Sequence, residues 1–106
     1  MSKETIKMNS IRIQRNGIKA VMYANEVSAE MCRKVITANW DKGDDANARK
    51  ALNKAHRGLA KSRSIINECQ RQLRLTKREL RKLNRQHDFR LKALAENQYE
   101  KTSLLG

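Results

Sequence analysis

The chain has 106 residues, which bounds it to one domain at most. Lys and Arg number 24 against 11 Asp and Glu, so the formal net charge is +13, and only 4% of the residues are aromatic. This balance indicates a polyanionic partner, which could be nucleic acid, an acidic membrane surface or an acidic protein surface, and disfavours a large aromatic-lined pocket.

Helix-breaking residues are scarce along the whole chain. Proline is absent, there are four glycines, and the apolar residues recur at helical spacing, whereas strand-like alternation is confined to the short "IRI" of residues 11–13. The sequence therefore predicts an all-α protein with helix over more than three quarters of its length.

The first predicted element is a helix over about residues 10–40. Residues 1–9 are polar and are predicted to form a flexible N-terminal tail, with Ser10 as the cap of the helix. One apolar stripe is expected to face the core, and its members are Ala20, Ala24, Val27, Met31, Val35 and Ala38.

The next feature is a turn at residues 41–45, within "WDKGDD". Gly43 suits the left-handed position that follows a helix end, and Asp44 or Asp45 suits the N-cap of the next helix. Trp40 is expected to cover the end of the helix interface. Two helices joined by so short a turn should lie antiparallel, which predicts a helical hairpin over residues 10–75.

The second helix is predicted to run from about residue 45 to 98, with a C-terminal tail at 99–106. A row of mostly large residues repeats every seven positions, namely Leu52, Leu59, Ile66, Leu73, Leu80, His87 and Leu94. Its companion row is small until Leu83, and its members are Ala55, Ser62, Cys69, Thr76, Leu83 and Arg90. Such a seam favours close helix approach, within a hairpin or between two copies in a coiled-coil homodimer.

Helix lengths leave the end of the second helix unmatched. At roughly 1.5 Å per residue the first helix is about 45 Å long and the second about 80 Å, so an antiparallel partner reaches only to about residue 75. Residues 76–98 then form a basic helical arm that folds back near Asn84–His87 into a three-helix bundle, meets a second copy, or binds another molecule. The expected apolar contacts of this arm are Leu80, Leu83, Phe89, Leu91 and Leu94.

The arm carries a ladder of cations at three- and four-residue spacing. The candidate binding residues are Arg71, Arg74, Lys77, Arg78, Arg81, Lys82, Arg85 and Lys92. Only Glu79 and Asp88 oppose them between residues 71 and 92. Most rungs are arginines, whose planar fork grips phosphate or carboxylate at two points, and a merely soluble helix usually interleaves both signs of charge.

Three interpretations of the ladder are open. The simplest is a solvent-exposed charged face without a binding role, and the other two are functions. The first is direct binding of DNA or RNA through the phosphate backbone, with little sequence selectivity. The second is a helical adaptor or inhibitor that docks on an acidic surface of a protein partner, including a nucleic-acid-processing machine.

Catalytic and metal chemistry have no support in the sequence. Cys32, His56, Cys69 and His87 lack metal-ligand spacing, no nucleophile sits beside a base, and there is no phosphate-binding glycine loop, so we expect a non-enzyme without cofactor or metal. No run of 18 apolar residues occurs, so no membrane span is expected. The two cysteines do not form the spacing pattern of a disulfide-rich protein, so we expect reduced thiols. The expected location is the cytoplasm, away from membranes.

Overall fold

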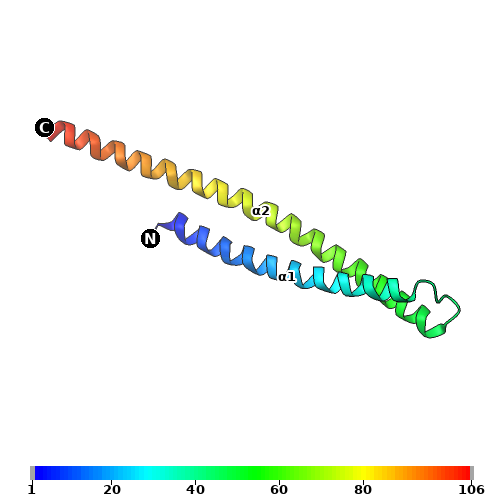
Figure 1. Cartoon of the computed structure of the whole chain (residues 1–106). Coiled ribbons are helices and arrows are strands. Elements are labelled where there is room, and N and C mark those ends of the chain that lie inside the picture. Colours follow the sequence, from blue (N-terminus) through cyan, green and yellow to red (C-terminus); the bar gives the residue numbers. More distant parts are fainter. Residues whose placement is uncertain (1, 106) are drawn as a thin grey trace. The chain divides into compact units, whose positions relative to one another are not determined.

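The computed structural model describes residues 2–105, and the side chains of residues 2–98. Helix α1 spans Lys3–Asn39 and helix α2 spans Ala46–Leu105, joined by a short turn (Figure 1). No strand occurs among the described residues. The predicted all-α helical hairpin is confirmed.

The start of α1 differs from the prediction. Ser2, and not Ser10, caps the helix, because its Oγ accepts a hydrogen bond from the Thr5 amide at 3.1 Å and its carbonyl accepts one from the Ile6 amide. Glu4 lies in the first turn, where a carboxylate interacts favourably with the helix dipole. The expected flexible tail over residues 1–9 is therefore corrected to helix from Lys3 onward.

The turn lies where the sequence places it, between Asn39 and Ala46. Asp45 is the N-cap of α2, since its Oδ1 accepts hydrogen bonds from the Asn47 amide at 2.8 Å and the Ala48 amide at 3.4 Å. Two expectations are wrong here. The first concerns Gly43, which has no positive φ: the Lys42 amide donates to the Asn39 carbonyl and the Asp45 amide to the Lys42 carbonyl, so the chain turns without a left-handed residue. The second concerns Trp40, which is 70% exposed and covers no interface.

The chain divides into two compact units. The turn unit comprises residues 16–73, and the terminal unit comprises residues 1–15 and 74–106. Each unit contains a segment of both helices, so each has its own helix–helix seam.

In the turn unit the small row of α2 is the buried one. Its members Ala55, Ser62 and Cys69 are buried, and so are Ala48, seven residues before Ala55, and Leu59 of the large row. On α1 Ala29 is fully buried. A Cβ added to Gly58 would lie 3.0 Å from the Cys32 Sγ, so the helices meet closely at a glycine. The predicted small, close-packed seam is confirmed here.

The prediction of which apolar stripe of α1 faces the core is wrong. Val27, Met31 and Val35 are 43%, 64% and 38% exposed, so they do not form the packed face. The least exposed positions of α1 in this unit instead follow a different 3–4 pattern, namely Ile18, Met22, Asn25, Ala29, Cys32, Ile36 and Asn39. This pattern includes two asparagines, which is why hydrophobicity alone favours the wrong face.

The terminal unit supplies a partner for the arm. Met8 and Ile11 of α1 form one buried cluster with Leu80 and Leu83 of α2, and Thr76 is buried as well. The expectation that residues 76–98 project without a partner is therefore corrected for their first turns, because α1 begins seven residues earlier than the sequence indicated.

Helix α2 also continues without a break through residues 84–88 and on to Leu105, which rules out the fold-back and the tail at 99–105.

Candidate nucleic-acid interface

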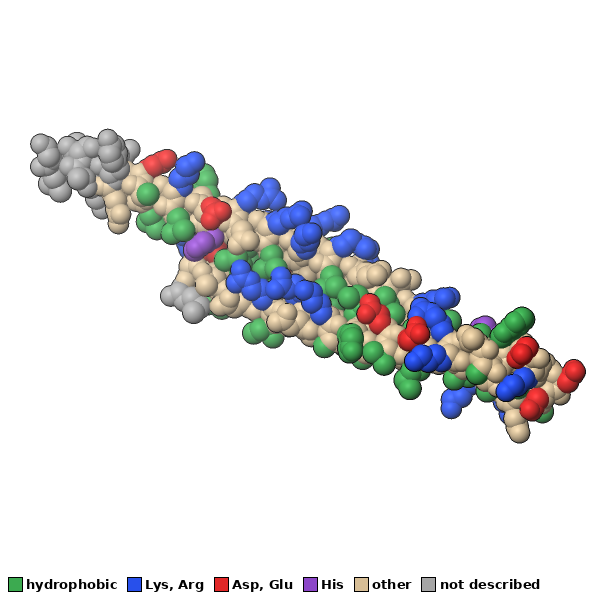
Figure 2. Space-filling view, viewed as in Figure 1, with side chains coloured by type: hydrophobic (Ala, Val, Ile, Leu, Met, Phe, Trp, Pro, Cys, Tyr) green, Lys and Arg blue, Asp and Glu red, His purple; other side chains and the backbone are tan. Residues whose placement is uncertain are grey.

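Six cations of the terminal unit form what we call the basic face. Its members are Arg74, Lys77, Arg78, Arg81, Lys82 and Arg85, and every one of them is exposed. They belong to one unbroken helix, and at about 100° per residue the four arginines and Lys82 lie on the side opposite the buried Thr76, Leu80 and Leu83, whereas Lys77 lies on the flank, about 60° around the helix from Leu80. Figure 2 shows the Lys and Arg side chains following α2.

The arginines make the centre of this face and the lysines its edges. Along the helix axis Arg74, Arg78, Arg81 and Arg85 alternate between two adjacent rows, and Lys77 and Lys82 fall about 70° to either side of them. Glu79 lies beyond the Lys82 edge, toward the packed side. A cationic strip about three side chains wide results, with no carboxylate inside it from residue 74 to 85.

No member of the basic face has an ion-pair partner among the side chains of residues 2–98. The ion pairs found there are Arg33–Glu30, Arg71–Glu68 and Arg90–Glu4. Like charges three and four residues apart repel each other, so the face costs the isolated helix a little stability and leaves its donors available to an anion.

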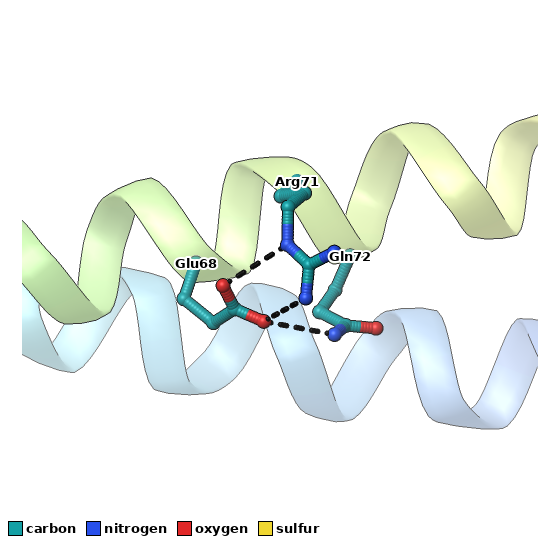
Figure 3. Close-up of polar contacts among 3 residues, drawn as sticks. All are labelled: Glu68, Arg71 and Gln72. Atoms are coloured by element: carbon teal, nitrogen blue, oxygen red, sulfur yellow. Dashed lines mark hydrogen bonds and ion pairs between the residues drawn. The ribbon is translucent and has the colours of Figure 1, made fainter.

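Arg71 is the exception within the predicted ladder, because it already has a partner. Its Nε and Nη2 donate to the two carboxylate oxygens of Glu68 at 3.1 and 2.8 Å, and Gln72 donates to the same carboxylate at 3.0 Å (Figure 3). These bonds lower the pKa of Glu68 to about 2 and raise that of Arg71 above its usual value. Glu68 lies three residues before Arg71, outside the ladder segment of residues 71–92, so the composition of that segment does not indicate this pair.

Lys92, the last rung of the predicted ladder, is exposed and lies about two helical turns beyond Arg85, where the basic face ends. Asp88 is four residues before it, but no ion pair joins the two. The structure thus brings six of the eight predicted cations into one unpaired face, with Arg71 neutralised at one end and Lys92 set apart at the other.

The predicted apolar contacts do not form a single surface. Leu80 and Leu83 are buried against α1 and are unavailable to a partner, whereas Phe89, Leu91 and Leu94 are 77%, 53% and 53% exposed. At about 100° per residue, Phe89 lies about 160° from Leu91 around the helix. Leu91 and Leu94 therefore continue the packed side of α2, and Phe89 lies on the cationic side.

The end of α1 holds a contact that the sequence did not predict. Glu4 accepts a hydrogen bond from Nη1 of Arg90 at 2.9 Å, across 86 positions of the chain. A backbone hydrogen bond at Glu4 and the charges of Arg90 and His87 lower the pKa of the Glu4 carboxyl. His87 is half-buried on the seam, and its Nδ1 has no hydrogen-bond partner among the described atoms.

Metal and membrane chemistry find no site in the described part of the chain. No group of three or more His, Cys, Asp or Glu side chains is placed to hold a metal ion, and both cysteines are free. None of the described helices combines the length and the apolar character that a membrane span needs.

Comparisons with known proteins give no relative: no family model, no curated protein and no solved structure matches this chain.

Proposed function

We propose that this chain is a small non-enzymatic protein that binds nucleic acid through the phosphate backbone, using the basic face of α2. The observation that carries the proposal is the row of four exposed arginines without ion-pair partners among the described side chains. Arginine donors in an unpaired, regularly spaced row suit phosphate oxygens, and their binding to phosphates is independent of sequence. The proposal includes a cytoplasmic location.

The burial of Leu80 and Leu83 supports this choice over protein docking. Exposed leucines beside the ladder would favour a protein partner, because a phosphate group makes no favourable contact with an apolar side chain. Both side chains are instead covered by Met8 and Ile11, so the basic face has a packed back and a polar front.

The test replaces Arg74, Arg78 and Arg81 with Gln, which keeps helix propensity and removes three charges. We expect weaker binding of DNA and RNA, to a similar extent for unrelated sequences. The slope of log affinity against log salt should fall by about 0.9 per lost contact on duplex DNA and about 0.7 on a single strand. Gel retardation and fluorescence anisotropy measure both quantities.

A matched control removes the same charge elsewhere on α2. Arg49, Arg57 and Arg63 are exposed residues of the turn unit, and their replacement with Gln should change affinity much less. Equal loss in both triple variants would mean that net charge alone attracts the nucleic acid. Failure of the unaltered protein to retard DNA or RNA at low salt would end the proposal.

The second candidate is docking on an acidic protein surface, as an adaptor or inhibitor, and one observation favours it. Leu91 and Leu94 are each 53% exposed on the packed side of α2, next to Arg90 where the contact with Glu4 lies. If this end of α2 binds a protein, replacing both leucines with Ser should abolish capture of that partner from nuclease-treated lysate. Leu75→Ser, at a 44% exposed position elsewhere on α2, is the control.

A further inference from the structure

Phe89 is the most exposed large hydrophobic side chain among residues 2–98, at 77%. Exposing a benzyl group to water is unfavourable, since full burial of such a side chain is worth roughly 1.5–3 kcal/mol. The ring of Phe89 lies beside the basic face and is available for contact with a partner.

The surroundings of Phe89 are cationic. Phe89 follows Lys82 by seven residues and Arg85 by four, and it precedes Lys92 by three, all within the unbroken helix α2. Side chains three or four residues apart, as Arg85 and Lys92 are from Phe89, are neighbours on a helix surface, and Lys82 lies two turns earlier in the same row. The ring consequently lies at the C-terminal end of the basic face, with one cation a turn before it and another a turn after it.

The apolar residues nearest in sequence do not share this side. Leu91 lies about 160° and Leu94 about 140° away around the helix, and Leu75, in the same row as Phe89, is 14 residues earlier, or roughly 21 Å along the axis. Neither a protein hot spot nor a membrane anchor is built from one ring among cations, because both need contiguous apolar area. Nucleic acid suits this arrangement, since bases offer planar faces to a ring while the phosphates meet the cations.

We propose that Phe89 stacks on an unpaired base while Arg85 and Lys92 bind the adjoining phosphates, so that the chain prefers single-stranded over duplex nucleic acid. This inference rests on the proposed function of the basic face. In a duplex both faces of each base are covered by neighbouring base pairs, and only the phosphates are available. A single strand offers both groups to α2.

The experiment measures the affinity of the full chain for three probes by fluorescence anisotropy. They are a single-stranded DNA oligomer, the same oligomer annealed to its complement, and an abasic strand with the same number of phosphates. Phe89→Ala should weaken binding of the base-containing single strand about 5- to 140-fold, which is roughly 1–3 kcal/mol per stacked base at 1.4 kcal/mol per tenfold. Binding of the duplex and of the abasic strand should not change.

Variants at the same position separate stacking from general hydrophobicity. Phe89→Trp should keep the preference for the single strand, and Phe89→Leu should lose most of it although the side chain stays apolar. Leu91→Ala, an equally apolar change on the other side of α2, should leave all three affinities unaltered. In a Trp40→Phe background, the fluorescence of Phe89→Trp should be quenched by the single strand and not by the abasic strand.

The outcomes distinguish this inference from the proposed function. If the unaltered chain binds all three probes equally well, or if Phe89→Ala lowers every affinity equally or none, the stacking role is overturned and phosphate binding stands. If the unaltered chain binds no probe, the proposed function itself fails. A protein or vesicle partner whose binding depends on Phe89 while single-stranded DNA binding does not would also overturn the inference.

Discussion

Glu68 is held in its charged form by two neighbours on α2. Hydrogen bonds from Arg71 and Gln72 lower its pKa from 4.5 to about 2. A carboxyl whose pKa is lower in the folded state stabilises that state above its unfolded pKa, so this contribution is complete above about pH 4.5 and is lost as the pH falls toward 2. We expect an NMR titration of the Glu68 carboxylate with a midpoint near 2, and Arg71→Gln should move it toward 4.5. A midpoint near 4.5 in the unaltered chain would show that the pair does not form in solution.

Two helical glycines of the turn unit differ in what a side chain would meet. Nothing lies within 4 Å of a Cβ added to Gly17, whereas a Cβ at Gly58 would approach the Cys32 Sγ at 3.0 Å. Gly17→Ala should therefore raise the free energy of unfolding by about 0.5–1 kcal/mol through backbone entropy alone. Gly58→Ala should gain less, and a Cys32→Ala background should restore its gain. Urea denaturation measures both, and equal gains in the Cys32 protein would argue against close contact there.

Helix α1 carries two apolar stripes, and the choice between them is a property of its partner. The exposed stripe with Val27, Met31 and Val35 is the more hydrophobic, which is why the sequence favours it. The small row of α2 accepts a face that contains Asn25 and Ala29 instead, because close backbone approach rewards small side chains. Periodicity within one helix predicts the rows of α2 correctly, but it does not reveal which stripe of α1 meets them.

Single truncations on the two faces separate the alternatives. Leu59 is 7% exposed, so Leu59→Ala should cost roughly 2–5 kcal/mol of stability. Met31 is 64% exposed, and Met31→Ala should stay within about 0.5 kcal/mol, as at other surface sites. Chemical denaturation followed by circular dichroism at 222 nm (a helix band) compares the two. A large loss for Met31→Ala would mean that a second surface covers this stripe in solution.

The start of α1 and the pairing of Glu4 with Arg90 are the parts that local reasoning could not provide. Both Ser2 and Ser10 are acceptable caps by residue type, and only the burial of Met8 and Ile11 decides in favour of the earlier start. The Glu4–Arg90 contact joins residues 86 positions apart, and no spacing rule reaches that far. By contrast, the exposed arginines of α2 follow from helical spacing alone, so most of the candidate site was predictable while its packed back was not.

Across the whole chain, the division into two units predicts that local disruption stays local. The terminal unit joins the two ends of the chain through Met8, Ile11, Leu80 and Leu83, while the turn unit has its own seam around Leu59. Regions with separate cores open with different free energies, and amide hydrogen exchange reports each of them. A lesion in the terminal cluster should therefore accelerate exchange in residues 3–15 and 74–98 and leave residues 16–73 protected.

Two isoleucines of α1 provide this test with its own control. Ile11 is 6% exposed and Ile13 is 72% exposed, so Ile11→Ala removes buried methyl groups and Ile13→Ala removes the same atoms from the surface. For Ile11→Ala we expect loss of protection confined to the terminal unit, at a local cost of roughly 2–5 kcal/mol, because the cluster keeps little besides Met8 to cover Leu80 and Leu83. Ile13→Ala should leave the exchange pattern unaltered. A uniform rise in exchange over both units after Ile11→Ala would show instead that the chain opens as one cooperative body.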